Sequence, residues 1–239
     1  MNSLSRNSQK SKHLIAILAL LFAVLGFALA TGQAQQLQKG VSVQMAATRS
    51  AAPMPAADNL DAWVVTITAD GNLYFGADPM TADELADWMK SHPRNREAKL
   101  YIKADARAPF AAVEKVLEIG RTMGFETPVL LTSQAEPTQP GTMVPPKGLE
   151  VLVGPIPGGT VATVAQIVSS GQTLPLLRIN GDEVSWSALE STLRQHFQKG
   201  DEPVVLLKAD DQLPFGRVVQ VIDTCRATGA KVILGTPGL

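Results

Sequence analysis

The chain has 239 residues, enough for one large domain or two small ones. Its net charge of −1, with 18% charged residues, excludes the bulk cationic field typical of nucleic-acid-binding proteins. The single cysteine, Cys225, excludes an intrachain disulfide and a multi-cysteine metal site. Cys225 shares an apolar helical face with Val218, Val221 and Ile222, which predicts a buried structural thiol.

The N-terminal segment combines basic residues with an apolar run. Arg6, Lys10 and Lys12 precede an uncharged stretch at 14–30, LIAILALLFAVLGFALA. As a helix, this stretch would be roughly 26 Å long, the lower limit for crossing the hydrocarbon core of a bilayer. Because basic residues lie before the run and none lies just after it, the sequence predicts a cytoplasmic segment at 1–13 and a membrane segment at 14–33.

Two interpretations of this segment stay open. A retained signal anchor would hold the rest of the chain outside the cytoplasmic membrane, and we favour it because the apolar run is long for a secretory signal. A cleaved signal would instead end at Ala30 or Ala34, which close small-x-small sequences. In both cases the bulk of the protein is exported. Residues 34–59 are rich in Gln, Ala, Ser and Pro and are expected to form a flexible tether.

The first globular segment, 60–133, begins as a β-hairpin. WVVTIT at 63–68 is rich in β-branched residues and predicts a strand. Asp70 and Gly71 supply a turn in which glycine adopts a positive φ at little cost. LYF at 73–75 then predicts the returning strand.

A capped helix and a strand–helix–strand unit complete this segment. Thr81 and Glu84 fit the T-x-x-E capping box, which satisfies two amides at a helix start. The strand KLYIK follows at 99–103, Pro109 suits the first turn of a second helix, and PVLLT at 128–132 is the last strand. The order β-β-α-β-α-β predicts a helix layer on a small sheet.

The same pattern recurs 105 residues later, since KADDQLPFGRVVQVIDTCRATGAKV at 208–232 matches KADARAPFAAVEKVLEIGRTMGFET at 103–127. A Pro-rich linker at 134–148 separates the copies and predicts a second domain at 149–239. Near its start, TVATVAQIV (160–168) fits a strand or a short helix, and its periodicity does not decide between them. The predicted fold class is α/β (α+β two-layer): an N-terminal helix followed by two small ββαβαβ domains.

The second copy carries an ordered motif: a strand ending in Ala-Asp, a short turn, an aromatic-glycine pair (Phe215-Gly216) and a helix of the form V-V-x-V-h-D. The first copy keeps the Ala-Asp strand end, the turn and the aromatic residue, Phe110. This order of motifs resembles the periplasmic domain of the ExbD/TolR family of biopolymer transport proteins, over 63–133 and 175–234. The family-motif positions, for which we expect a structural role, are Asp105, Pro109 and Phe110 in the first copy and Asp210, Pro214, Phe215 and Gly216 in the second.

The resemblance implies a motor accessory rather than an enzyme, with no cofactor and no metal. Members of the family pair with an ExbB/TolQ-type channel subunit and pass proton-motive force to a TonB/TolA-type energiser, using one aspartate in the transmembrane helix. The run at 14–30 contains no Asp or Glu, so the proton-carrying role is assigned to no residue here. We therefore expect a single-pass inner-membrane protein with periplasmic C-terminal domains, which docks or scaffolds through protein–protein contacts.

A second interpretation is a secreted or periplasmic tandem-domain binding module with no link to proton-motive force. The sequence leaves a homodimer open under both interpretations and predicts no nucleic-acid partner. Family members normally carry one periplasmic copy, so the duplication is a departure from the family pattern.

The remaining polar residues favour structural roles. Asp105 and Asp210 are expected to cap the turn or helix that follows each of them. His92 and His196 end predicted helices and lack the spacing of metal ligands. GPIPGG at 154–159 lacks the Lys-Ser/Thr of a phosphate-binding loop.

Overall fold

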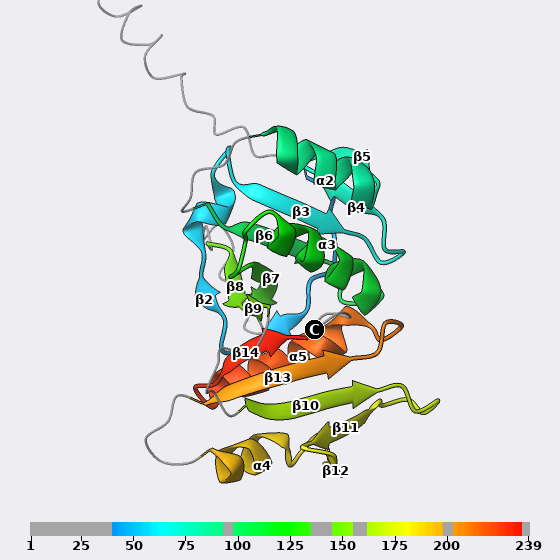
Figure 1. Ribbon diagram of the computed structural model, residues 1–239, viewed down its shortest axis with the longest axis vertical. Helices are drawn as coiled ribbons and strands as arrows, with labels where there is room; N and C mark the ends of the chain where they lie inside the picture. Colours follow the sequence, from blue (N-terminus) through cyan, green and yellow to red (C-terminus); the bar gives the residue numbers. More distant parts are fainter. Residues whose placement is uncertain (1–39, 93–97, 135–144, 155–161, 198–202, 236–239) are drawn as a thin grey trace, which may run out of the picture. The chain divides into compact units, whose positions relative to one another are not determined.

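The structure, a computed structural model, describes residues 40–92, 98–134, 145–154, 162–197 and 203–235. The predicted cytoplasmic segment, the apolar run and the first part of the predicted tether therefore lie outside the described residues. Within the described part, no helix combines the length and apolar character needed to cross a bilayer. The two copies form two separate mixed sheets, each with its own helices (Figure 1).

The first copy is built on an eight-stranded sheet in the order β2-β8-β7-β6-β3-β4-β5, with β1 paired to β7. Parallel pairing joins β3 to β6 and β6 to β7, and the two helices form the connections, as the ββαβαβ pattern predicts. The elements are β1 (Ala47–Thr48), β2 (Ala52–Pro53), the 3-10 turn η1 (Pro55–Asp58), β3 (Trp63–Ile67), β4 (Leu73–Phe75), β5 (Asp78–Met80), α2 (Ala82–Ser91), β6 (Leu100–Ala104), α3 (Phe110–Thr122), β7 (Val129–Gln134) and β8 (Lys147–Glu150).

The second copy repeats this order on a six-stranded sheet, β12-β11-β10-β13-β14-β9. The ambiguous stretch at 160–168 is a strand from residue 162 onward, and its alternate residues Ala165 and Ile167 are fully buried. The elements are β9 (Leu152–Val153), β10 (Ala162–Val168), β11 (Leu176–Ile179), β12 (Asp182–Glu183), α4 (Leu189–His196), β13 (Val204–Ala209), α5 (Phe215–Ala227) and β14 (Lys231–Leu234).

Local sequence signals set the ends of these elements. The capping box at Thr81 and Glu84 is confirmed, with both reciprocal hydrogen bonds present. Gly71, in the predicted turn, has a φ of 79°. Pro109, expected in the first turn of its helix, instead lies at the N-cap position of α3, and Pro214 lies at the N-cap position of α5.

The prediction of a flexible tether at 34–59 is wrong from residue 40 onward, because this part of the chain folds onto the first sheet. It contributes β1, β2 and η1. A small apolar cluster holds it there: Met45, Met54 and Ala57 of this segment with Tyr101, Val129 and Leu131 of the sheet. A few apolar residues in a polar segment therefore decide its structure, which average composition does not report.

The end of the predicted linker and the start of the predicted second domain also belong to the first sheet. Leu149 of β8 pairs with β7, and Val151, between β8 and β9, is buried where the chain passes to the second sheet. Gly148 is required for this pairing, because a Cβ atom there would lie 2.4 Å from Cγ1 of Val129. Residues 135–144 of the linker lie outside the described residues.

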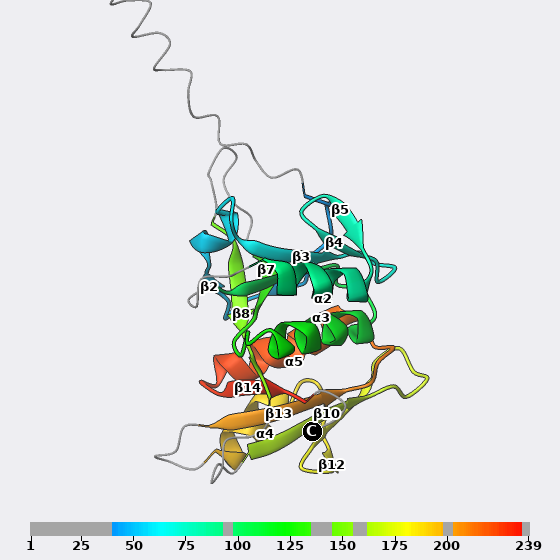
Figure 2. The ribbon, with the colours of Figure 1, turned by 45° about the horizontal axis from the view of Figure 1, so that its top comes forward.

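One hydrophobic interior runs through both copies. α3 and α5 lie side by side between the two sheets (Figure 2), and their buried residues form part of a single apolar cluster. α5 also contacts β1 and β8 of the first sheet, and α3 contacts β9 of the second. Each copy thus has its own sheet, as expected, but the two interiors are joined.

Candidate functional site

The structure brings the family-motif positions of the two copies into direct contact. Pro109 and Pro214 form an isolated antiparallel β-bridge, which places the starts of α3 and α5 against each other. Phe110 and Phe215, the first residues of the two helices, are both buried. We call this region, residues 105–111 with residues 210–216, the inter-copy contact.

Four backbone hydrogen bonds build the inter-copy contact. They run from Phe110 N–H to Leu213 C=O (2.9 Å), from Phe215 N–H to Ala108 C=O (2.8 Å), from Ala111 N–H to Asp211 C=O (2.9 Å) and from Gly216 N–H to Ala106 C=O (2.8 Å). Adding 105 to the first-copy residue of a bond and subtracting 105 from its second-copy residue gives the reciprocal bond. The two motifs are thus related by a pseudo-twofold axis, the arrangement of an isologous dimer interface within one chain.

The hydrogen bonds of this contact use amides that a helix cannot satisfy by itself. The first N–H groups of an α-helix have no carbonyl partner within the helix, and Phe110 and Ala111 are the first two residues of α3. The same holds for Phe215 and Gly216 of α5. Because each helix start binds carbonyl groups of the other copy, the contact replaces the side-chain caps that both helices lack.

Gly216 lets the two chains approach closely. A Cβ atom there would lie 3.1 Å from both Cβ and the carbonyl oxygen of Ala106, closer than nearly all real Cβ contacts. The first copy has Ala111 at the matching position. The glycine of the family motif therefore has a packing role in this chain.

Asp105 and Asp210 differ in what they bind. Asp105 is buried and accepts hydrogen bonds from the Arg107 guanidinium (2.8 and 2.9 Å), the Arg107 N–H (3.0 Å) and the Gln44 N–H (3.0 Å). The Arg107 guanidinium holds the pKa of Asp105 well below its usual range. Asp105 thus caps its turn, as predicted.

The same prediction is wrong for Asp210. Its carboxylate accepts a hydrogen bond from the N–H of Ser169, just after β10 (2.7 Å), rather than from the turn that follows it. The position that matches Arg107 is Gln212, so the second copy offers no cation there. Asp105 and Asp210 therefore do not form a carboxylate pair.

A third aspartate, Asp223, binds residues 49 and 50, just before β2, to α5 of the second copy. Asp223 ends the VVQVID motif, and its carboxylate accepts hydrogen bonds from the N–H groups of Arg49 (3.1 Å) and Ser50 (2.8 Å) and from the Ser50 hydroxyl. The Ser50 hydroxyl also lies 2.9 Å from the Asp223 carbonyl oxygen. The final Asp of the motif was the only signal in the sequence for this contact.

Cys225 and His92 are both engaged within the fold. Cys225 is fully buried, as predicted, and burial raises the pKa of its thiol to about 12. His92 ends α2, where its ring stacks on Trp88 and its Nδ1 lies 2.8 Å from the Trp88 carbonyl oxygen. Among the residues that the structure describes, no group of His, Cys, Asp and Glu is placed to hold a metal ion.

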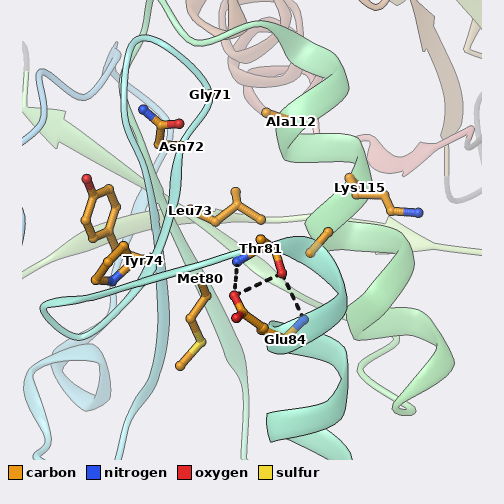
Figure 3. Close-up of a pocket in the computed structure, with 11 residues that line it drawn as sticks. Gly71, Asn72, Leu73, Tyr74, Met80, Thr81, Glu84, Ala112 and Lys115 are labelled. Carbon is orange, nitrogen blue, oxygen red and sulfur yellow. Dashed lines mark hydrogen bonds between the residues drawn. The ribbon is translucent and has the colours of Figure 1, made fainter.

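The first copy has a surface hollow of about 650 Å³ between β4, β5, α2 and α3 (Figure 3). Glu84 lines it, but its carboxylate already accepts hydrogen bonds from the Thr81 N–H (2.7 Å) and hydroxyl (2.9 Å). Those hydrogen bonds lower the pKa of Glu84. The acid of the hollow therefore serves the helix cap and is not poised for acid–base chemistry.

The comparison with protein families finds the same two copies of one domain. The family model described as biopolymer transport protein ExbD/TolR matches residues 6–135 and again residues 133–237. No curated protein matches the chain. Members of this family are non-enzymatic transport components, anchored in the inner membrane with a periplasmic domain, and they generally partner ExbB/TolQ and TonB/TolA. The two matches together span nearly the whole chain, which therefore belongs to the ExbD/TolR family and carries its domain twice in tandem.

Proposed function

We propose that this chain is a single-pass inner-membrane protein whose two C-terminal domains lie in the periplasm. In this proposal it serves an ExbB/ExbD/TonB-type or Tol-type energised transport system and acts by protein–protein contact. Residues 1–13 would be cytoplasmic and 14–33 would form the membrane segment. The observation that carries the proposal is the double match to the family model, of which only the first includes the N-terminal apolar run.

In this proposal the chain docks or scaffolds and does not itself carry protons. A carboxyl group in hydrocarbon is costly and persists only where loading and unloading a proton is useful. The run at 14–30 contains no Asp or Glu, so it offers no such group. The partners expected from the family are an ExbB/TolQ-like channel subunit and a TonB/TolA-like energiser.

The inter-copy contact supports a function in which the two domains of one chain act together as a single unit. The surface that would join two single-copy chains around a twofold axis is filled here by the second copy of the same chain. We therefore propose that one membrane segment presents a two-domain unit, which needs no homodimer through this surface. A homodimer through another surface would add a second such unit.

Affinity capture from native membranes tests the function. The tagged full chain, cross-linked before solubilisation, should recover a multi-span ExbB/TolQ-like channel subunit. A matched control, Leu20→Arg with Leu21→Arg, places charges in the apolar run and should lose the partner. A chain that recovers no channel subunit would contradict the motor proposal. A mature N-terminus at residue 31 or 35 would favour the secreted binding module, because the small-x-small sites end there.

A further inference from the structure

Residues 41–50, which we call the strap, are bound at the inter-copy contact. Near the start of the strap, the Gln44 N–H donates to the Asp105 carboxylate (3.0 Å) and the Gln44 C=O accepts from the Ala106 N–H (2.8 Å). The Ala106 C=O in turn accepts the Gly216 N–H of the inter-copy contact (2.8 Å). Ala106 therefore lies between the strap and the second copy and bonds to both.

The far end of the strap is bound to the second copy itself. The N–H groups of Arg49 (3.1 Å) and Ser50 (2.8 Å) donate to the carboxylate of Asp223 on α5, and β1 contacts the same helix. Hydrogen bonds to a charged acceptor are stronger than those between neutral groups. The strap thus joins the inter-copy contact at one end to α5 at the other.

The middle of the strap is held less firmly. The two-residue strand β1 pairs with β7, the Thr48 and Thr132 hydroxyls lie 2.7 Å apart, and Met45 is half-buried against the sheet. A segment with a short ladder and few buried apolar contacts opens locally, at a free energy below that of global unfolding. Release of the Asp223 end therefore favours departure of the whole strap.

The second copy has a corresponding segment without this clamp. β9 lies 105 residues after β1 (152 − 47 = 105), pairs in parallel with β14 as β1 does with β7, and contacts α3 as β1 contacts α5. The positions that match Asp223 and Ser50 are Glu118 and Pro155, and proline has no N–H to donate. The double hydrogen bond to an acid thus belongs to the first copy, whose strap follows the N-terminal segment.

We propose that the strap latches the two copies together: bound to Asp105 and Asp223 it keeps the inter-copy contact closed, and its release loosens that contact. Release takes the Gln44 bonds away from Asp105 and Ala106, so the turn that holds Gly216 loses support. Residue 40 is the first that the structure describes. In the proposed function, on which this step rests, a movement of the membrane segment at 14–33 would reach the inter-copy contact through the strap.

Hydrogen exchange of the full chain in detergent tests the latch without any transport partner, so its result is separate from that of the capture experiment. In Asp223→Ala the Ser50 amide should lose most of its protection. The amides of Phe110 and Phe215, which bond across the contact, should lose at least about threefold. Amides of β10, which pairs with β11 and β13, report global unfolding and should change less. Asp223→Asn keeps one acceptor oxygen and should show a smaller loss at all three probes.

Glu118→Ala is the matched control, because it removes the acid at the pseudo-twofold position, where Pro155 offers no N–H. It should leave the protection of Phe110 and Phe215 unchanged. Loss of Ser50 protection in Asp223→Ala without a change at Phe110 and Phe215 would overturn the latch, as would a Ser50 amide that stays protected. An equal loss in Glu118→Ala, or an equal loss at the β10 amides, would overturn it too.

Discussion

Gly216→Val should weaken the inter-copy contact by forcing the two chains apart. Even the first added carbon, Cβ, would lie 3.1 Å from Ala106, and two of the neighbouring atoms are backbone. Overpacking of this kind costs about 1–3 kcal/mol, and weakening the bond from Gly216 N–H to Ala106 C=O adds about 1 kcal/mol. The expected loss is about 2–4 kcal/mol, a large share of the roughly 5–15 kcal/mol that stabilises a typical domain.

Urea unfolding of the full chain and hydrogen exchange at Phe110 measure this effect. Gly216→Val should lower the unfolding midpoint and the protection of the Phe110 amide together, since that amide bonds to the second copy. The matched control is Ala111→Gly, at the pseudo-twofold position, which introduces no clash and should cost no more than about 1 kcal/mol. An unchanged midpoint and unchanged Phe110 protection in Gly216→Val would refute the close approach described here.

Three further predictions concern single side chains. Asp223→Ala should release Arg49 and Ser50 from α5, at a cost of about 1–3 kcal/mol in stability. Tryptic cleavage after Arg49 should then be faster than in the wild type. Unchanged cleavage would contradict the role given to the Asp223 hydrogen bonds. Cys225 should react with a thiol reagent at pH 8 only as fast as the protein unfolds, because burial raises the pKa of its thiol to about 12; rapid labelling of folded protein would contradict its burial. Asp105→Asn should flatten the acid limb of the stability curve. Its lowered pKa means that wild-type Asp105 contributes stability above about pH 4, which is lost as the pH falls further, and a variant with the wild-type acid limb would contradict this.

The elements that the sequence predicted well are those whose signals are local. The T-x-x-E box at Thr81 places the start of α2, because both of its reciprocal bonds lie within four residues. The Asp70–Gly71 pair marks a turn because glycine reaches positive φ at little cost. The repeat itself was visible because both copies keep the same turn and helix lengths around Pro109 and Pro214.

The parts that the sequence did not predict depend on distant partners. Residues 40–59 have the composition of a tether, but Met45 and Met54 find an apolar surface on β6 and β7 that only the folded sheet provides. The inter-copy contact consists mainly of backbone hydrogen bonds, which leave little trace in side-chain patterns. The glycine at position 216 was visible in the sequence, but only its close approach to Ala106 in the folded chain explains why a glycine is needed there.

The fusion of two copies explains how the inter-copy contact became asymmetric. In a homodimer, every substitution appears on both sides of the twofold axis, so an acid at the Glu114 position and an acid at the Asp211 position would each occur twice. In one chain the second side carries Val219 and Ala106 instead, so the two sides of the pseudo-twofold axis can differ in charge. Because the two copies can change independently, the second copy has Gly216 where the first has Ala111. The close approach that needs glycine is therefore present on one side of the pseudo-twofold axis only.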